Sequence, residues 1–316
     1  MKTLYIITTN QCNMSCPFCY TQFVPQFTKN AERSCINTKT AIDVINKGYK
    51  GEKYDYVIFH GGEPLLYPKE ILEILDGTSS QKDTTFSIQT NLVYKQLSQD
   101  QIKVLVRLGS YGTSFSVDRF LGKKELEEQF KDNVKFLNTL GLECTLLVTL
   151  TEMQIMRQNP WRLLDYINDL GIQKIVLERP ILTNQQYKEN RESLENLYAD
   201  IDSYMLTCAK IFPREYTNLY WLVEKSIEHG ITLYNTKCSN ETFTLYNNEF
   251  KYGCPSLECR NENNSEMLTR CLECEYYRWC GMDCECFNHL CAFPKKTFSY
   301  IKSVLEQEKN NTGKSN

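Results

Sequence analysis

The sequence has little excess charge of either sign, no long apolar run and only three histidines. Its 36 Lys and Arg residues nearly balance 39 Asp and Glu residues, giving a formal net charge of -3, whereas a nucleic-acid-binding protein is expected to carry a basic patch. No stretch approaches the roughly 18 apolar residues of a membrane-spanning helix, and residues 1–11 lack the apolar region and cleavage site of a signal peptide. We therefore expect a cytoplasmic protein with neither nucleic acid nor membrane as a partner. The histidines show no spacing typical of metal ligands: His60, His229 and His289.

Cysteine, in contrast, is abundant, with 15 residues that fall mainly into two clusters. Three lie at Cys12, Cys16 and Cys19, and nine lie between residues 238 and 291. Structural disulfides are rare in a reducing cytosol, and clustered thiols in that compartment are more often metal or iron–sulfur ligands. The three isolated thiols are interpreted as small packed side chains: Cys35, Cys144 and Cys208.

Strand-like and helix-like segments alternate through the first 180 residues. The expected strands are rich in β-branched and aromatic residues and cover 3–9, 55–60, 85–90, 111–117, 143–150 and 173–178. The expected helices have periodic, charged sequences and cover 39–49, 68–76, 98–108, 124–140 and 160–170. This alternation is typical of parallel strands joined by crossover helices. Six such units predict an α/β fold with a partial (β/α)6 TIM-like barrel, in which chemistry gathers beyond the carboxyl ends of the strands.

The composition changes after the sixth strand and divides the chain into four parts. Residues 1–182 form the predicted barrel, and 183–233 have a polar and aromatic pattern that predicts a helical connector. Residues 234–295 hold the second cysteine cluster and few apolar residues, which predicts a small C-terminal iron–sulfur domain that depends on bound metal for folding. A hairpin with its turn at 247–248 is expected within this part. Residues 296–316 are predicted to form a C-terminal helix and a polar tail.

The spacing Cys12-x3-Cys16-x2-Cys19 is the strongest functional signal, and it directly follows the first strand. Three thiolates can bind three irons of a [4Fe–4S] cube, whose usual complement is four thiolates. The fourth iron then stays open, and S-adenosylmethionine (SAM) can chelate it through its amino and carboxylate groups. A zinc site with a remote fourth ligand is the alternative interpretation.

Polar or glycine-rich groups close several expected strands, and together with the three cysteines they resemble the motifs of radical SAM enzymes. Gly61-Gly62-Glu63-Pro64 after the second strand is similar to the family motif that holds the methionine amino group of SAM. Glycines allow close backbone approach, and Glu63 supplies a carboxylate for an ammonium. An ordinary tight turn is the alternative. The resemblance covers about residues 1–180 and implies contacts with SAM for several further residues: Tyr20, Gln89, Asn91, Ser116 and Asp118.

The second cysteine cluster resembles the SPASM domain, a C-terminal extension of many radical SAM enzymes. Four cysteines between residues 271 and 284 follow its spacing, Cys-x2-Cys-x5-Cys-x3-Cys. The resemblance implies one or two auxiliary [4Fe–4S] clusters with these ligands: Cys271, Cys274, Cys280 and Cys291 for the outer one, and Cys238, Cys254, Cys284 and Cys259 for the inner one. In place of Cys259 the iron could be open, and Cys286 could replace Cys291. Two zinc sites are the alternative to iron–sulfur clusters.

SPASM-type enzymes act on peptides or proteins more often than on small molecules, which favours maturation of a ribosomally made peptide as the function. The resemblance implies reductive cleavage of SAM to a 5′-deoxyadenosyl radical, which abstracts hydrogen from the peptide. The product would be a thioether, a carbon–carbon crosslink or an epimerised residue. The electron would come from flavodoxin or ferredoxin. Since 11 residues precede Cys12, a leader peptide would bind the barrel itself or a separate adaptor.

Three other functions stay open, and no residue is assigned as a catalytic base. A sulfatase-maturating enzyme would oxidise Cys or Ser to formylglycine, but the Asp118-Arg119 pair lacks the glycine expected for it. Dehydrogenation or epimerisation of a small metabolite is the second alternative. The third is a zinc-stabilised binding module without catalysis, against which the glycine and strand-end motifs count.

Overall fold

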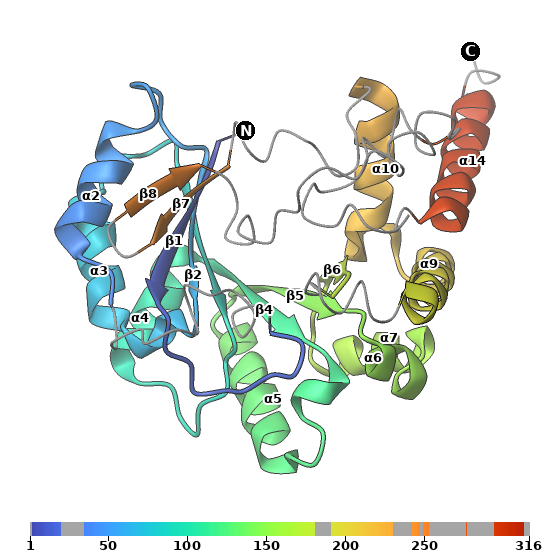
Figure 1. Cartoon of the computed structure of the whole chain (residues 1–316), viewed down its shortest axis with the longest axis horizontal. Helices are drawn as coiled ribbons and strands as arrows, with labels where there is room; N and C mark the ends of the chain where they lie inside the picture. Colours follow the sequence, from blue (N-terminus) through green and yellow to red (C-terminus); the bar gives the residue numbers. More distant parts are fainter. Residues whose placement is uncertain are drawn as a thin grey trace. The chain divides into compact units, whose positions relative to one another are not determined.

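The computed structural model forms two compact units (Figure 1). The first unit contains all three cysteines of the loop after the first strand. The structure describes residues 2–19, 35–180, 191–229, 242–246, 249–252, 276 and 294–312. The first unit consists of Met1–Leu147, Leu170–Ile172 and Lys237–Glu258, and the second of Val148–Asp169, Gln173–Thr236 and Cys259–Asn316.

The first unit is built on a mostly parallel sheet whose strands run in the order β5-β4-β3-β2-β1-β7-β8. The pairs β1–β2, β2–β3, β3–β4 and β1–β7 are parallel, and β8 is antiparallel to β7. The predicted hairpin is therefore present, and its first strand extends the sheet beyond β1. The strands are β1 Thr3–Thr9, β2 Tyr56–Gly61, β3 Thr85–Thr90, β4 Ser110–Phe115, β5 Glu143–Thr149, β7 Thr242–Tyr246 and β8 Glu249–Tyr252.

The predicted strands of this unit are confirmed to within one or two residues. The fourth strand was expected to run to residue 117, but β4 ends at Phe115. Residues Val117–Arg119 form a short 3-10 helix, η3, because the carbonyl of Ser116 accepts a hydrogen bond from the Arg119 amide at 3.1 Å. This turn brings Arg119 back toward the end of its own strand.

Four helices follow the strands of the first unit and lie along one face of its sheet (Figure 1). Helix α4 shows why these segments are helical: Ser98 and Gln101 form a reciprocal capping box at its start, and Gly109 ends it in the left-handed conformation with φ 74°. Val104 and Leu105 are fully buried on its inward side, as expected of a helix that packs on a sheet. The helices are α2 Thr38–Lys47, α3 Pro68–Gly77, α4 Gln99–Leu108 and α5 Lys124–Thr139.

The two faces of the sheet differ in burial. In β2, Val57 and Phe59 are fully buried, whereas the alternate residues Ile58 and His60 are only half-buried. Because successive side chains of a strand point to opposite faces, the half-buried residues share the face away from the helices. The side chains available to a ligand at this sheet are therefore the polar ones of the half-buried face.

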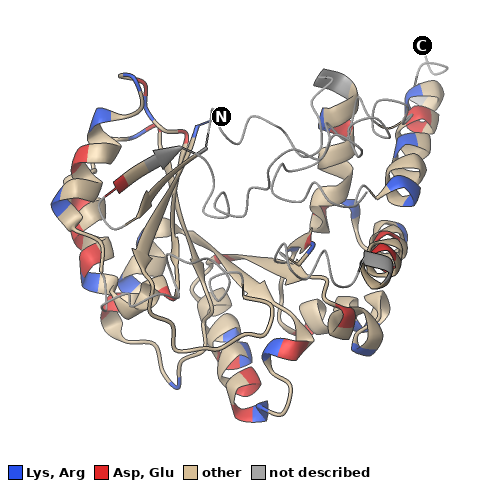
Figure 2. Cartoon of the chain, in the orientation of Figure 1, with Lys and Arg blue, Asp and Glu red and all other residues tan. Residues whose placement is uncertain are grey.

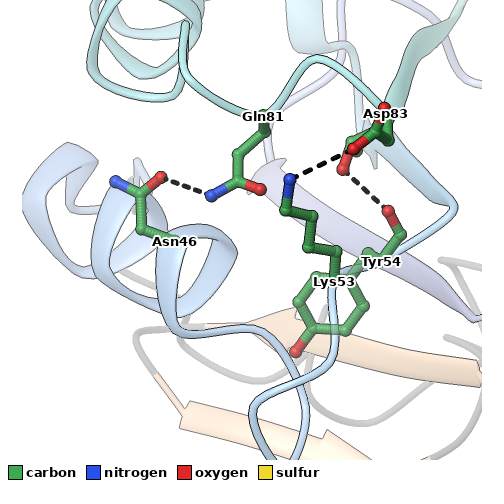
Figure 3. A network of polar contacts seen from close by, with 6 residues as sticks. Asn46, Lys53, Tyr54, Gln81 and Asp83 are labelled. Atoms are coloured by element: carbon green, nitrogen blue, oxygen red, sulfur yellow. Dashed lines mark hydrogen bonds and ion pairs between the residues drawn. The ribbon is translucent and has the colours of Figure 1, made fainter.

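A polar network closes the opposite end of the strands, at the amino ends of β2 and β3 (Figure 3). The Lys53 ammonium lies 3.2 Å from the carboxylate of Asp83, and the Gln81 amide donates to the side-chain oxygen of Asn46 at 3.1 Å. Asn46 belongs to α2, so the network joins that helix to the segments entering both strands. Exposed ion pairs contribute only about 0–1 kcal/mol each, so the Lys53–Asp83 pair adds little to stability.

The second unit is mainly helical in its described part. Helix α9 packs against α6, α7 and α14, and α10 packs against α14 and β6. Helices α9 and α10 lie within residues 183–233, where a helical connector was predicted, and α6 is a short helix that was not predicted. The elements are α6 Glu152–Arg157, α7 Pro160–Asp169, β6 Lys174–Glu178, α9 Arg191–Ile211, η4 Arg214–Tyr216, α10 Asn218–His229 and α14 Lys295–Thr312.

Charged residues of both signs alternate along the helices in the view of Figure 2. None of the described helices combines the length and the apolar character needed to cross a bilayer. The helix surfaces agree with the near balance of charge in the sequence.

The start of α14 is held by a carboxylate from another helix. Asp202 of α9 accepts hydrogen bonds from the backbone N–H groups of Lys296 and Thr297, at 2.9 and 3.0 Å, and from the Thr297 hydroxyl at 2.8 Å. A helix leaves its first backbone N–H groups without partners inside the helix. Asp202 of α9 therefore caps the amino end of α14, in place of a capping residue from α14 itself.

We predict that Asp202→Ala lowers the free energy of unfolding by about 1–3 kcal/mol, because it leaves buried donors of α14 unsatisfied. Asp200→Ala is the matched control, since Asp200 is exposed on the same helix, and we expect it to change stability by less than about 0.5 kcal/mol. Urea denaturation of both variants measures the difference. Equal stability of the two variants would contradict the capping role.

Candidate functional site

The loop that carries the three cysteines leaves the sheet beside the glycine-rich loop after β2. Thr9, the last residue of β1, lies opposite Gly61 in the parallel register. The amide of Gly62 donates to the Thr9 carbonyl, and the amide of Glu63 donates to the Gln11 carbonyl, both at 2.7 Å. The two loops therefore run together as a continuation of the β1–β2 ladder.

The glycines of this motif are required by the close approach of the two loops. Gly61 has φ 130°, and a Cβ on it would lie 2.3 Å from the Thr9 carbonyl oxygen. A Cβ on Gly62 would lie 2.1 Å from the carbonyl oxygen of Gln11. No side chain fits at such distances. The close backbone approach that the glycines were predicted to allow is therefore the approach of the cysteine loop to this loop.

Asn91, which the sequence analysis placed in the site, connects the end of β3 to the cysteine loop. Its side-chain amide lies 3.6 Å from the sulfur of Cys12 and donates to the side-chain oxygen of Asn13 at 2.6 Å. Asn13 in turn donates to the Val93 carbonyl at 2.7 Å. The Cys12 sulfur also accepts from the Met14 amide at 3.4 Å. The position of the first cysteine is thus set by β3 as well as by β1.

Glu63 lies under this junction rather than in its opening, with an exposed fraction of 0%. One carboxylate oxygen accepts from the Leu65 amide at 3.0 Å and the Thr90 hydroxyl at 2.6 Å, and the other accepts from the Asn91 amide at 2.6 Å. Burial raises the pKa of Glu63, while these hydrogen bonds and the charge of Arg119 oppose that rise. The carboxylate therefore anchors the β3 turn.

The turn that Glu63 anchors has an uncommon backbone conformation. Leu92 has φ 54° and is fully buried, although bulky residues rarely adopt the left-handed region. Hydrogen bonds hold the turn on both sides: the Asn91 side chain accepts from the Val93 amide at 2.8 Å, and Asn133 donates to the Leu92 carbonyl at 3.0 Å. Such conformations cluster at functional sites, where the surroundings enforce them.

The thiols of the loop are held close to charged groups. Burial raises the pKa of Cys12 to about 11, and the charges of Glu63 and the other loop thiols act in the same direction. Burial also raises the pKa of Cys16, and the positive charges of Arg119 and Lys123 oppose it. Cysteines bind metals as thiolates, so metal binding at this loop releases protons and depends on pH.

Ser116 and Asp118 contact each other at the end of β4, where the Ser116 hydroxyl donates to the Asp118 carboxylate. Gln89, on the half-buried face of β3, donates to the Ser114 hydroxyl at 3.0 Å. The charge of Asp118 raises the pKa of Cys16, so this strand end lies within electrostatic reach of the cysteine loop. Asn13, Thr90 and Arg119 also contribute to the site, but they were not predicted as site residues. The only sign of this in the sequence is that each lies beside a cysteine or at the end of a strand.

The chain belongs to the radical SAM superfamily, whose family profile matches residues 6–195, more than half of the sequence. It is therefore an enzyme, and the superfamily implies a [4Fe–4S] cluster and SAM as cofactors. The predicted partial barrel is confirmed by the same match and by solved structures that share the fold.

Two such structures were solved with SAM bound. That of anSMEcpe with bound AdoMet has a TM-score of 0.69 at 15% identity, covering 98% of this chain and 95% of that one. That of SuiB from Streptococcus suis has a TM-score of 0.57 at 13% identity, covering 90% and 73%. An uncharacterized protein of Archaeoglobus fulgidus is 29% identical over 110 residues, 35% of this chain and 24% of that relative, so the match spans about a quarter of its length.

The described residues fit the cluster that the superfamily implies. The loop from Cys12 to Cys19 offers three thiols, which are soft donors suited to iron–sulfur clusters. Within the ranges that the structure describes, no group of three His, Cys, Asp or Glu side chains is placed to hold a single metal ion. In a cube each thiolate binds a different iron, so the ligands need not converge on one point.

Several predicted ligands lie outside the described residues and remain predictions. They are Tyr20 and the cysteines of the second cluster: Cys238, Cys254, Cys259, Cys271, Cys274, Cys280, Cys284, Cys286 and Cys291.

His60 supports the glycine-rich loop from the half-buried face of the sheet. Its Nδ1 accepts from the Gly61 amide at 2.7 Å, so the proton of the neutral ring is on Nε2. The ring also hydrogen-bonds Gln89, and Tyr5 packs edge-on against it with 5.9 Å between the ring centroids. Burial lowers the pKa of His60 to about 4. The ring is therefore neutral at physiological pH.

This depressed pKa predicts a pH-dependent stability. The unfolded histidine, with a pKa near 6.5, takes up a proton before the folded one, so stability due to His60 is complete above about pH 6.5 and falls as the pH approaches 4. In His60→Gln this contribution is absent. We expect the difference in unfolding free energy between the wild type and His60→Gln to shrink by about 2 kcal/mol from pH 7 to pH 5. Chemical denaturation at both pH values measures it, and a constant difference would contradict the lowered pKa of His60.

Proposed function

We propose that this enzyme reductively cleaves SAM and abstracts a hydrogen atom from a peptide substrate, which yields a post-translational modification. The observation that carries the proposal is the pairing of the cysteine loop with the Gly61–Glu63 loop, which places the loop of Cys12, Cys16 and Cys19 beside a side-chain-free backbone at the carboxyl ends of β1 and β2. Such strand ends are where barrel enzymes place their chemistry.

Cys12, Cys16 and Cys19 are the proposed ligands of the cluster, which leaves one iron open for SAM. When bound, the cluster supplies the electron that cleaves the sulfonium bond and releases a 5′-deoxyadenosyl radical. The chain contributes position: Asn91 and the Met14 amide face the Cys12 sulfur and orient the first ligand. The hydrogen bonds of Asn91 tie that ligand to the anchored turn after β3.

The proposed SAM site comprises the backbone at Gly61 and Gly62 and the polar ends of β3 and β4. Glu63 is assigned an indirect role, because its carboxylate is fully buried and already accepts three hydrogen bonds from the chain. It would fix the backbone that holds the methionine moiety of SAM. Ser116 and Asp118 are the proposed ribose contacts, and Gln89 lies next to them on the half-buried face.

A peptide is the favoured substrate because two of the structural neighbours were solved with peptides. SuiB from Streptococcus suis was solved bound to the precursor peptide SuiA, and anSMEcpe was solved with AdoMet and a Cp18Cys peptide. The proposed product is a thioether, a carbon–carbon crosslink or an epimerised residue. Flavodoxin or ferredoxin is the proposed electron donor, and a separate adaptor can supply leader-peptide binding.

The cluster assignment predicts that Cys16→Ala releases no 5′-deoxyadenosine above background after reduction with dithionite, because one iron loses its thiolate. The matched control is Cys144→Ala, since Cys144 is a buried thiol of β5 on the face turned away from His60 and Gln89. We expect the control to retain cleavage. Chromatography of the reduced, anaerobic protein with SAM measures both, and normal cleavage by Cys16→Ala would refute the ligand assignment.

The second cysteine cluster is proposed to hold one or two auxiliary [4Fe–4S] clusters in a SPASM-type domain. Anaerobic analysis should give about twelve irons per chain for three clusters, or about eight for two. We predict that Cys274→Ala loses about four irons, keeps part of the SAM cleavage and loses the modified product. A Cys274→Ala protein with the full wild-type iron content would exclude Cys274 as a ligand.

A further inference from the structure

Arg119 is the largest fully buried side chain among the described residues, with an exposed fraction of 1%. It follows Asp118 directly, at the position where the sequence analysis noted a missing glycine. Arginine is almost never fully buried unless it is paired. Its burial at the end of β4 therefore calls for a partner that stabilises a positive charge.

The guanidinium of Arg119 is fixed in position from two sides. It donates hydrogen bonds to the carbonyls of Ser114 and Asn91, and thereby joins the end of β4 to the turn after β3. Its central carbon lies 5.0 Å from the ring centroid of Phe120 and 5.5 Å from that of Phe130. The charge is thus held in a defined place, in surroundings where an ion costs several kcal/mol unless it is compensated.

Two titratable groups near this charge belong to the cysteine loop and to the carboxylate that anchors the turn after β3. Arg119 acts electrostatically on Glu63 and on Cys16. Glu63 is already engaged by three donors from the chain. Asn91 connects the two ends of the arrangement, because its carbonyl accepts from Arg119 while its side chain approaches the sulfur of Cys12.

We propose that the buried positive charge of Arg119 lies near the cluster bound by Cys12, Cys16 and Cys19 and makes that cluster easier to reduce. The inference rests on the proposed ligand set. Reduction transfers one electron from an external donor, a low-potential iron–sulfur or flavin protein, or dithionite in the assay, and the donor is oxidised by one electron. The negative charge of the cluster then rises by one, and a fixed cation nearby stabilises the more negative state. Net charge and solvent exposure are known determinants of cluster potential.

The test is a redox titration of the reconstituted full chain with dithionite, followed by electron paramagnetic resonance. The signal that is missing from Cys16→Ala identifies the cluster concerned. At a fixed potential, we expect Arg119→Gln to lower the ratio of reduced to oxidised cluster about tenfold, which corresponds to 59 mV for one electron. Arg119→Lys keeps the charge, and we expect it to titrate like the wild type.

Lys123 provides the matched control, because it also acts electrostatically on Cys16 but is exposed to solvent. Solvent and salt screen exposed charges, so we expect Lys123→Gln to change the ratio by less than about twofold. Coinciding titrations of Arg119→Gln and the wild type overturn the proposal, and so does a shift in Lys123→Gln as large as that in Arg119→Gln.

If Arg119→Gln does not yield folded protein, Arg119→Lys can still overturn the proposal. It keeps the charge but does not reproduce the planar fork that reaches two carbonyls, so its melting temperature is expected to fall while its potential stays at the wild-type value. A potential that moves with the loss of stability overturns the proposal. A wild-type protein with no signal that depends on Cys16 would instead refute the proposed ligand set.

Discussion

The site depends on two backbone hydrogen bonds that carry the β1–β2 ladder beyond the end of the sheet. They join Gly62 to Thr9 and Glu63 to Gln11, at a separation that excludes any Cβ on the glycine residues. The same two hydrogen bonds fix the start of the cysteine loop on one side and the backbone of Glu63 on the other. A side chain at either glycine would separate the loops and move the first thiol away from Asn91.

Glu63 extends this constraint to the third strand. Its buried carboxylate accepts from Thr90 and Asn91, so the turn after β3 is held in its left-handed conformation at Leu92. Asn91 then approaches Cys12. The ends of three strands are thereby held together by hydrogen bonds of the chain itself, which is the preorganisation that a precisely placed cofactor needs.

The elements were predictable because each carries a local signal, whereas the contacts between them were not. Alternating β-branched strands and amphipathic helices located β1 to β5 to within one or two residues, and only the 3-10 turn after β4 was read as strand. The pairing of β7 with β1 joins residues more than 230 positions apart, and nothing in either segment specifies it. The cysteines, Gly61 and Gly62 were recognisable as motifs, since geometry restricts the residue types there.

The contacts of the buried polar residues Glu63 and Arg119 could not be predicted in this way, because they are made with partners distant in sequence. Glu63 was predicted to accept from an ammonium, which stays a prediction, and the structure adds two donors to its oxygens from residues 27 and 28 positions away. Arg119 gave no signal of burial, since arginine at a strand end is usually solvated. Its place between Phe120, Phe130 and two carbonyls shows that the site is supported by fixed charges beneath the strand ends.

The charges of Glu63 and Arg119 depend on each other. Removing the Glu63 carboxylate alone would leave the Arg119 guanidinium without its nearby anion, and removing the guanidinium alone would leave the carboxylate buried without a cation. The two charges are therefore coupled, and a substitution at either is expected to act on the geometry of the Asn91 turn as well as on the thiols above it.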